Sequence, residues 1–238
     1  MAGSQCCENP PALSSACGGG SVVESFGGLK SYINGSLDSK LAILLVSDVF
    51  GFEAPNFRKL ADKVAAAGYF VVVPDFFYGD PFDPAKMPIK TWVQSHGTEK
   101  GFQDAKPVVT ALKERGASAV GAAGFCWGGK VVAELAKTGD IKAGVMLHPS
   151  LVTVEDIKEI KSHIAVLGAE VDHISPPELL KQFEEILSAK KEVESYVKIF
   201  PGVSHGWTVR YDANDENAVK RAEEAHRDMM EWFAKYVK

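Results

Sequence analysis

The sequence lacks long apolar runs, an excess of basic residues and a recognisable targeting segment. No apolar run approaches the roughly 20 residues that a membrane-spanning helix needs, so we expect no membrane partner. A net charge of -5 over 238 residues argues against a nucleic-acid partner. Residues 1–20 have neither the positively charged start nor the apolar segment of a secretory signal. We therefore expect a cytoplasmic protein.

Cysteine is also scarce. Of the four cysteines, Cys6, Cys7 and Cys17 fall within the first 20 residues, which is no basis for a disulfide framework in a chain of this size. The adjacent pair Cys6 and Cys7 has no nearby histidine to complete a zinc site and is a weak lipidation signal. Because residues 1–20 are rich in Gly, Ser, Pro and Ala, we expect a flexible tail carrying exposed, reduced thiols.

The remaining residues, 21–238, have the composition of one folded domain, with 46% hydrophobic and 24% charged residues over the whole chain. Apolar and glycine-bounded segments predict strands at 22–25, 30–35, 41–46, 69–73, 118–120, 144–148, 164–168 and 196–200. Amphipathic segments predict helices at 56–67, 102–115, 131–136, 155–161, 178–189 and 216–236. This alternation predicts an α/β fold with a single, mostly parallel sheet covered on both faces and no large cap domain.

Two segments leave the pattern open. Pro107 must lie in the first turn of the helix predicted at 102–115, or else break that helix. The connection at 74–100 is long and rich in proline and aromatic residues. It either forms a wall or lid of a substrate pocket, or Phe76 and Phe77 simply cover the end of the sheet.

Residues 124–128, Gly-Phe-Cys-Trp-Gly, lie between a predicted strand and a predicted helix. Their spacing is that of a G-x-S-x-G nucleophile elbow with Cys126 in place of serine. A sharp turn of this kind strains the backbone of its central residue and requires small neighbours. The helix dipole would favour a thiolate at Cys126. The alternative is a glycine-rich turn that holds an inert buried cysteine.

A nucleophile elbow needs an acid and then a histidine later in the chain. The loop after the strand at 164–168 carries Glu170, Asp172 and His173, and the loop after the strand at 196–200 carries His205. Open α/β sheets place their sites past the carboxyl ends of strands, where both loops fall. We therefore predict a triad of Cys126, Asp172 and His205, with Glu170 as the competing acid.

Three motifs now point to a known family. Phe-Cys-Trp-Gly-Gly at 125–129, Gly-Ala-Glu-Val-Asp-His at 168–173 and Ser-His-Gly-Trp at 204–207 resemble those of dienelactone hydrolases (carboxymethylenebutenolidases), in particular eukaryotic, plant-like members. The resemblance runs from about residue 21 to the C-terminus. It implies an α/β-hydrolase fold, favours Asp172 over Glu170, and implies a thiol hydrolase of small esters or lactones that needs no metal or organic cofactor.

The mechanism also requires an oxyanion hole. The backbone N–H of Trp127 follows the nucleophile, and we expect a second N–H from Val49, in the loop after the strand at 41–46. In the family, a glutamate beside that second residue helps to activate the thiol. Here the position holds Asp48, which is one methylene shorter, and Phe50 follows in the same loop as a further possible contact to substrate.

Bacterial members of the family hold the substrate carboxylate with arginines. One would fall near Tyr78, where this chain has no arginine, and the other falls near Arg210. Arg210 is therefore either part of an anion clamp or a solvated charge. The absent arginine argues against dienelactone itself as substrate.

Other histidines and other functions remain open. We expect His96, His163 and His226 to be solvated, and His148 to be a pocket wall or a second base. Some plant proteins that resemble this chain are called β-glucanases, and a glycosidase would use paired carboxylates drawn from Asp48, Glu170 and Asp172. A non-catalytic ligand-binding homologue is a third hypothesis. The expected partner is a small molecule, and the chain is either a monomer or a homodimer.

Overall fold

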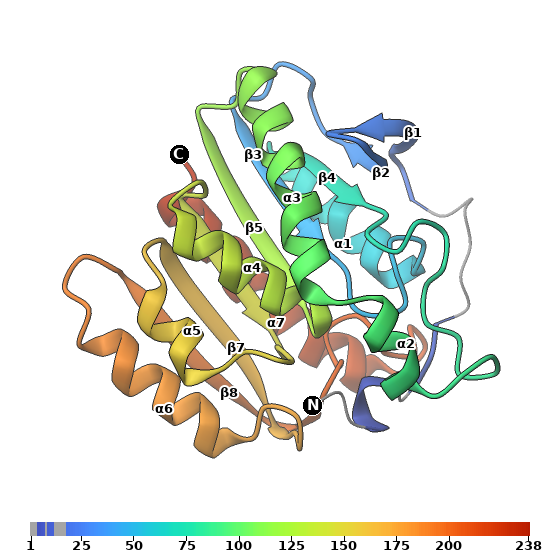
Figure 1. Cartoon of the computed structure of the whole chain (residues 1–238), viewed down its shortest axis with the longest axis vertical. Coiled ribbons are helices and arrows are strands. Elements are labelled where there is room, and N and C mark those ends of the chain that lie inside the picture. Colours follow the sequence, from blue (N-terminus) through green and yellow to red (C-terminus); the bar gives the residue numbers. More distant parts are fainter. Residues whose placement is uncertain (1–3, 8, 12–17) are drawn as a thin grey trace.

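The computed structural model describes residues 4–7, 9–11 and 18–238, whose elements are arranged as in Figure 1. The strands are β1 (Ser21–Phe26), β2 (Leu29–Asn34), β3 (Leu41–Val46), β4 (Phe70–Pro74), β5 (Ala119–Phe125), β6 (Ala143–Leu147), β7 (His163–Val171) and β8 (Ser195–Ser204). The helices are η1 (Ser4–Cys7), α1 (Pro55–Ala66), α2 (Ile89–Ser95), α3 (Thr98–Glu114), α4 (Trp127–Thr138), α5 (Val154–Glu159), α6 (Pro177–Ser188) and α7 (Glu216–Tyr236). None of these helices is long and apolar enough to span a bilayer.

All eight strands form one sheet in the order β1-β2-β4-β3-β5-β6-β7-β8. The hairpin of β1 and β2 pairs antiparallel with β4, and every pairing from β4 to β8 is parallel. The predicted fold class is therefore confirmed. Because parallel strands end at the same edge, the loops that follow β3, β5, β6, β7 and β8 meet at one side of the sheet.

Both faces of the sheet are covered, which explains the unbroken apolar sequence of β3. Leu44 and Val46 face a core shared with α3, α4 and α6, while Ile43 and Leu45 face a second core formed with α1 and α7. Figure 1 shows α3 and α4 in front of the sheet and α7 behind it. Continuous apolar sequence is expected of strands buried on both faces.

Helix α3 corrects one prediction. It begins at Thr98, earlier than expected, and continues through Pro107 without a break. Proline removes one helical hydrogen bond and typically costs about 3 kcal/mol in a helix interior. The complete burial of Val108 and Leu112 against the rest of the core offsets that cost.

Part of the N-terminal segment lies against the folded domain. Residues 4–7 form the 3-10 helix η1, and the side chain of Gln5 is buried. Cys7 is half-buried and packs against the core, so the expected exposed thiol is wrong at this position. The side chains of Cys6 and Cys17, on which the lipidation and thiol predictions also depended, lie outside the described residues.

Candidate active site

Cys126 occupies a strained turn between β5 and α4. Its backbone angles are φ 51° and ψ -110°, in a region that residues with a side chain rarely adopt. A Cβ at Gly124 would lie 2.1 Å from the Gly128 carbonyl oxygen, and a Cβ at Gly128 would lie 2.3 Å from the Val46 carbonyl oxygen. Only glycine fits at both positions. The turn therefore has the shape of a nucleophile elbow, with backbone strain held in place by close packing.

Asp172 and His205 are brought together by the ends of β7 and β8. Nδ1 of His205 lies 2.8 Å from Oδ2 of Asp172, and both side chains are buried. The other carboxylate oxygen accepts hydrogen bonds from the backbone N–H groups of Ile174 and Ser175. These bonds fix the carboxylate, which in turn fixes the orientation of the imidazole.

The competing residues of the same loop point elsewhere. Glu170 and His173 are both exposed. The carboxylate of Glu170 accepts a hydrogen bond from the backbone N–H of Gly202 instead of reaching His205. Of the two acids at the end of β7, Glu170 within the strand and Asp172 directly after it, Asp172 is therefore the one that contacts the histidine.

The sulfur of Cys126 lies close enough to His205 to raise the pKa of its imidazole. Burial alone would lower the pKa of His205, but the neighbouring Cys126 sulfur and the Asp172 carboxylate raise it to about 9. A hydrogen bond between the His205 side chain and Cys126 contributes to this rise, so the imidazole is within reach of the sulfur. A cation next to a cysteine favours the deprotonated form of that cysteine.

Ser150 is a site residue that sequence reasoning missed. Its Oγ lies 3.7 Å from Cys126 Sγ, and its backbone N–H donates to the Cys126 carbonyl oxygen at 2.9 Å. Ser150 follows β6 by three residues, so it reaches the same edge of the sheet as the other loops. Its position just after a strand that was predicted from the sequence could have identified Ser150 as a candidate.

The two backbone N–H groups predicted to form an oxyanion hole are those of Trp127 and Val49. Trp127 is the first residue of α4, where a helical N–H has no partner within the helix. Among the described residues, the N–H of Val49 donates no hydrogen bond, although its carbonyl oxygen accepts one from Phe82. Both groups belong to loops at the site edge of the sheet.

Asp48 and Arg210 form a buried ion pair, with 3.4 Å between Oδ2 and Nε. Burial raises the pKa of Asp48 to about 6; Arg210 opposes this rise and the Cys126 sulfur adds to it. Arg210 is only 6% exposed, so its reading as a solvated charge is wrong. Its guanidinium also lies 5.7 Å from the centre of the Phe50 ring.

Tyr78 lies apart from this cluster. Its side chain is 58% exposed, and its hydroxyl donates to Asp104 and accepts from Lys100, both on α3. Phe76 and Phe77 in the same connection are buried, with ring centres 6.0 Å and 4.9 Å from that of Trp127. These two aromatic residues therefore cover the end of the sheet, as the core-packing alternative predicted.

Two further histidines are buried behind His205. His148 packs edge-on against His205, with ring centres 5.0 Å apart, and its Nε2 lies 2.7 Å from the hydroxyl of Thr208. Burial holds the pKa of His148 well below its usual range. His226 contacts the Thr208 carbonyl oxygen, and burial lowers its pKa to about 4, so the prediction of a solvated His226 is wrong.

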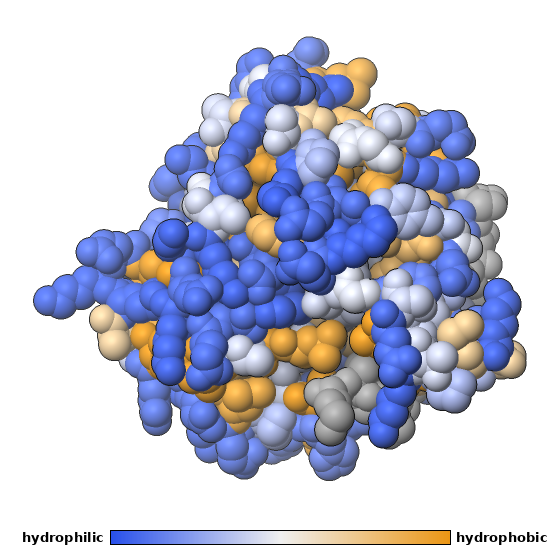
Figure 2. All heavy atoms as spheres, viewed as in Figure 1, coloured by the Kyte–Doolittle hydropathy of each residue, from blue (hydrophilic) through white to orange (hydrophobic). Residues whose placement is uncertain are grey.

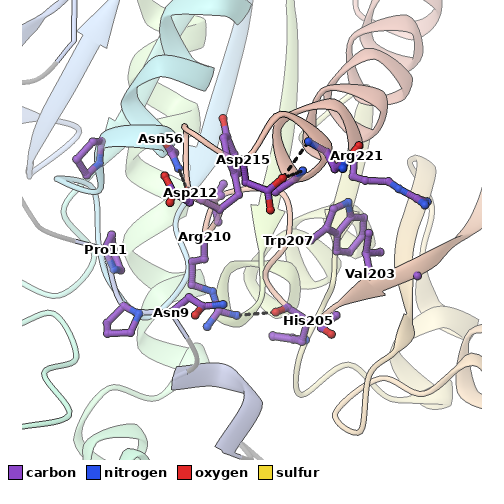
Figure 3. A pocket seen from close by; sticks show the side chains of 18 residues that line it. Asn9, Pro11, Asn56, Val203, His205, Trp207, Arg210, Asp212, Asp215 and Arg221 are labelled. Carbon is purple, nitrogen blue, oxygen red and sulfur yellow. Dashed lines mark hydrogen bonds between the residues drawn. The ribbon is translucent and has the colours of Figure 1, made fainter.

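Two clefts open beside the site. The larger, of about 1130 Å³, reaches His205, Trp207 and Arg210 and continues to Arg221, as Figure 3 shows. The smaller, of about 660 Å³, is lined by Phe50, among others. Within the described ranges, no group of three or more histidine, cysteine or acidic side chains is arranged to hold a metal ion.

Known proteins resemble this chain over most of its length. A profile of the dienelactone hydrolase family matches residues 29–237. The chain is 46% identical over 195 residues to a Zea mays protein named endo-1,3;1,4-beta-D-glucanase, covering 80% of this chain and 64% of that protein. It is 35% identical over 217 residues to a carboxymethylenebutenolidase homologue of Xenopus tropicalis, covering 88% of each.

A solved structure shows the same fold. The dienelactone hydrolase of Anabaena variabilis superposes with a TM-score of 0.67 at 14% identity, over 96% of this chain and all of that one (100%). The match of the family profile to most of the chain, together with these relatives, shows that the chain belongs to the dienelactone hydrolase family of α/β hydrolases.

Proposed function

We propose that this protein hydrolyses small carboxylic esters or lactones, with Cys126 as nucleophile, His205 as general base and acid, and Asp172 as the residue that orients the imidazole. The observation that carries the proposal is the buried His205–Asp172 bond of 2.8 Å beside a sulfur that raises the pKa of His205. The family, and the names of its carboxymethylenebutenolidase members, support an ester or lactone as substrate.

The first half-reaction forms an acyl-enzyme. The Cys126 proton passes to Nε2 of His205, and the sulfur attacks the carbonyl carbon of the substrate. The N–H groups of Trp127 and Val49 would donate to the oxygen as it becomes negative. When the carbon–oxygen bond breaks, His205 returns the proton to the departing alcohol, and a thioester remains on Cys126.

The second half-reaction uses water. His205 removes a proton from a water molecule, whose oxygen attacks the thioester carbonyl carbon. The carbon–sulfur bond then breaks, the acid leaves, and the proton returns to the sulfur. For a lactone the alcohol and acid are the two ends of one product. Ionised Asp172 stabilises the imidazolium in both halves.

Arg210 is suited to hold a negatively charged part of the substrate, because it lies at the large cleft and is already fixed by Asp48. Tyr78, which we had considered for substrate contact, lines neither cleft. We propose that Arg210, and not Tyr78, binds the negatively charged part of the substrate.

The name of the maize relative raises a second candidate function, β-glucan hydrolysis. A glycosidase needs one carboxyl with a raised pKa and a second carboxylate about 5–10 Å away. Asp48 meets the first requirement, but Asp172 is committed to His205 and Glu170 is exposed and bonded to Gly202. The observations favour the thiol mechanism.

Cys126→Ala separates the two functions. Wild type, Cys126→Ala and Cys126→Ser would be assayed on aryl esters, lactones and a mixed-linkage β-glucan, with thermal unfolding as a check of the fold. We expect ester and lactone turnover to fall at least about 1000-fold in both variants. Glucan hydrolysis that persists in Cys126→Ala, without ester turnover in wild type, would support the carboxylate mechanism. Labelling of Cys126 without turnover of any substrate would favour a binding protein.

A further inference from the structure

The N-terminal segment is hydrogen-bonded to residues 171–173, which we call the acid loop because they include Asp172. Nε2 of Gln5 donates to the Val171 carbonyl oxygen at 3.2 Å, and Oε1 of Gln5 accepts from the His173 N–H at 2.6 Å. Val171 and His173 flank Asp172 on both sides. One buried amide side chain, 7% exposed, thus bridges the backbone around the proposed acid.

The same segment contacts the arginine of the site. Nη1 of Arg210 donates to the Gln5 carbonyl oxygen at 3.2 Å, and Nη2 donates to the His205 carbonyl oxygen at 3.3 Å. Arg210 therefore joins three parts of the molecule that are remote in sequence: the N-terminal segment, the His205 loop and Asp48.

Beyond Gln5 the segment lies between the two clefts. Pro10 and Pro11 line both the large cleft and the small one. His205 lines only the large cleft and Phe50 only the small cleft. In Figure 3, Asn9 and Pro11 lie on the side of Arg210 away from Trp207.

Cys126, the proposed nucleophile, is enclosed by the surrounding residues. Cys126 has no exposed surface and lines neither cleft. Figure 1 shows η1 beside α2, near the end of the sheet from which α4 begins. Figure 2 shows a mostly hydrophilic face on which several hydrophobic residues are exposed, some of them in the lower half of the view.

We propose that Gln5 and residues 9–11 form a partition across the substrate cleft, held in place by the hydrogen bonds of Gln5, and that this partition limits the length of the acyl group that the site accepts. With the partition in place, a substrate at Cys126 can extend only within one of the two compartments. Loosening it would join them into one longer groove past Phe50. This inference rests on the proposed function, since it concerns access to Cys126.

Two variants of the full chain test the partition. Gln5→Ala removes both side-chain bonds to the acid loop, while Pro10→Gly combined with Pro11→Gly keeps those bonds and removes the rings between the clefts. The matched control is Gln103→Ala, which removes an exposed amide bonded to Glu99 on α3. Each protein would be assayed for kcat/KM on aryl acetate and aryl octanoate, and for alkylation of Cys126 by iodoacetamide and by a bulky N-aryl maleimide.

We expect the octanoate-to-acetate ratio of kcat/KM to rise about 10-fold or more in both test variants and to change less than about twofold in the control. Maleimide labelling of Cys126 should accelerate more than iodoacetamide labelling. An unchanged ratio in both test variants, with the fold intact by thermal unfolding, would overturn the proposal. Cys126→Ala in the same assay tests the proposed function separately. Hydrolysis that persists in this variant would show that Cys126 is not the nucleophile. The ratio of kcat/KM values in the other variants would still test the partition.

Discussion

At the scale of single residues, Cys126 is surrounded by groups that act on its charge in opposite directions. His205, whose pKa is raised to about 9, is a cation that favours a thiolate at Cys126, whereas ionised Asp48 disfavours it. The opposition is visible in the pKa of Asp48, which burial raises, Arg210 lowers and the Cys126 sulfur raises again, to about 6. Asp48 therefore interacts electrostatically with the thiol, although its side chain is one methylene shorter than the glutamate expected from the family resemblance.

Removing the Asp48 charge should make Cys126 more reactive. Because the carboxylate and the thiolate repel each other, Asp48→Asn should shift the pH of half-maximal Cys126 alkylation downward by about one unit. Asp48→Glu keeps the charge and should shift it little. The measurement is the rate of iodoacetamide labelling of Cys126 from pH 4 to 9, followed by peptide mass spectrometry. An upward shift in Asp48→Asn would mean that Asp48 activates the thiol as a base.

At the scale of elements, the strand-to-helix turn from β5 to α4 depends on backbone approach more than on side chains. Gly128 packs against the carbonyl oxygens of Val46 and Ser47, at 2.3 Å and 2.8 Å from the position of a Cβ. These contacts fix α4 against the loop that carries Val49 and Asp48. A change at this glycine alters the elbow and the second oxyanion donor together.

Gly128→Ala should therefore cost both stability and activity. We expect it to destabilise the fold by about 3 kcal/mol or more, since backbone must move to admit the methyl group. Gly97→Ala is the control, because a Cβ at Gly97 meets nothing within 4 Å and its φ is not positive. It should change the unfolding free energy by less than about 1 kcal/mol. Urea unfolding and ester turnover measure both effects, and a Gly128→Ala protein with wild-type stability would contradict this account.

Elements with a clear hydrophobic pattern could be predicted from the sequence, whereas features that depend on packing between distant segments could not. The bounds of the strand at 41–46 and of the helix at 216–236 agree with the prediction, because the strand is continuously apolar and the helix has a regular amphipathic pattern. Helix α3 was not, since its continuity through Pro107 depends on packing against other elements. The same holds for Gln5 and Ser150, which reach the site only because distant segments fold against it.

At the scale of the whole molecule, buried histidines set opposite dependences of stability on pH. The folded-state pKa of His205, about 9, lies above the ordinary value of 6.5, so its contribution is full below pH 6.5 and is lost as pH rises through 9. The folded-state pKa of His226, about 4, lies below 6.5, so its contribution is full above pH 6.5 and is lost as pH falls toward 4. The histidine contribution is therefore largest near pH 6.5.

His226→Gln should remove the acid side of this profile. An amide at residue 226 can still donate to the Thr208 carbonyl oxygen but cannot bind a proton in the unfolded chain. We expect wild type to lose about 2–3 kcal/mol more unfolding free energy than the variant between pH 6.5 and pH 4.5. Urea titrations at a series of pH values give both curves. Parallel curves would show that His226 is not neutral in the folded protein.

The central claim is that the sulfur of Cys126 becomes acylated during turnover. Its most direct test is the intact mass of the protein, quenched in acid within milliseconds to seconds of mixing with an excess of an aryl ester. The account predicts one added acyl group per chain, located on the peptide that contains Cys126, and absent in Cys126→Ala. Turnover of the ester by wild type with no acyl group on Cys126 at any time, or with the same adduct in Cys126→Ala, would contradict it.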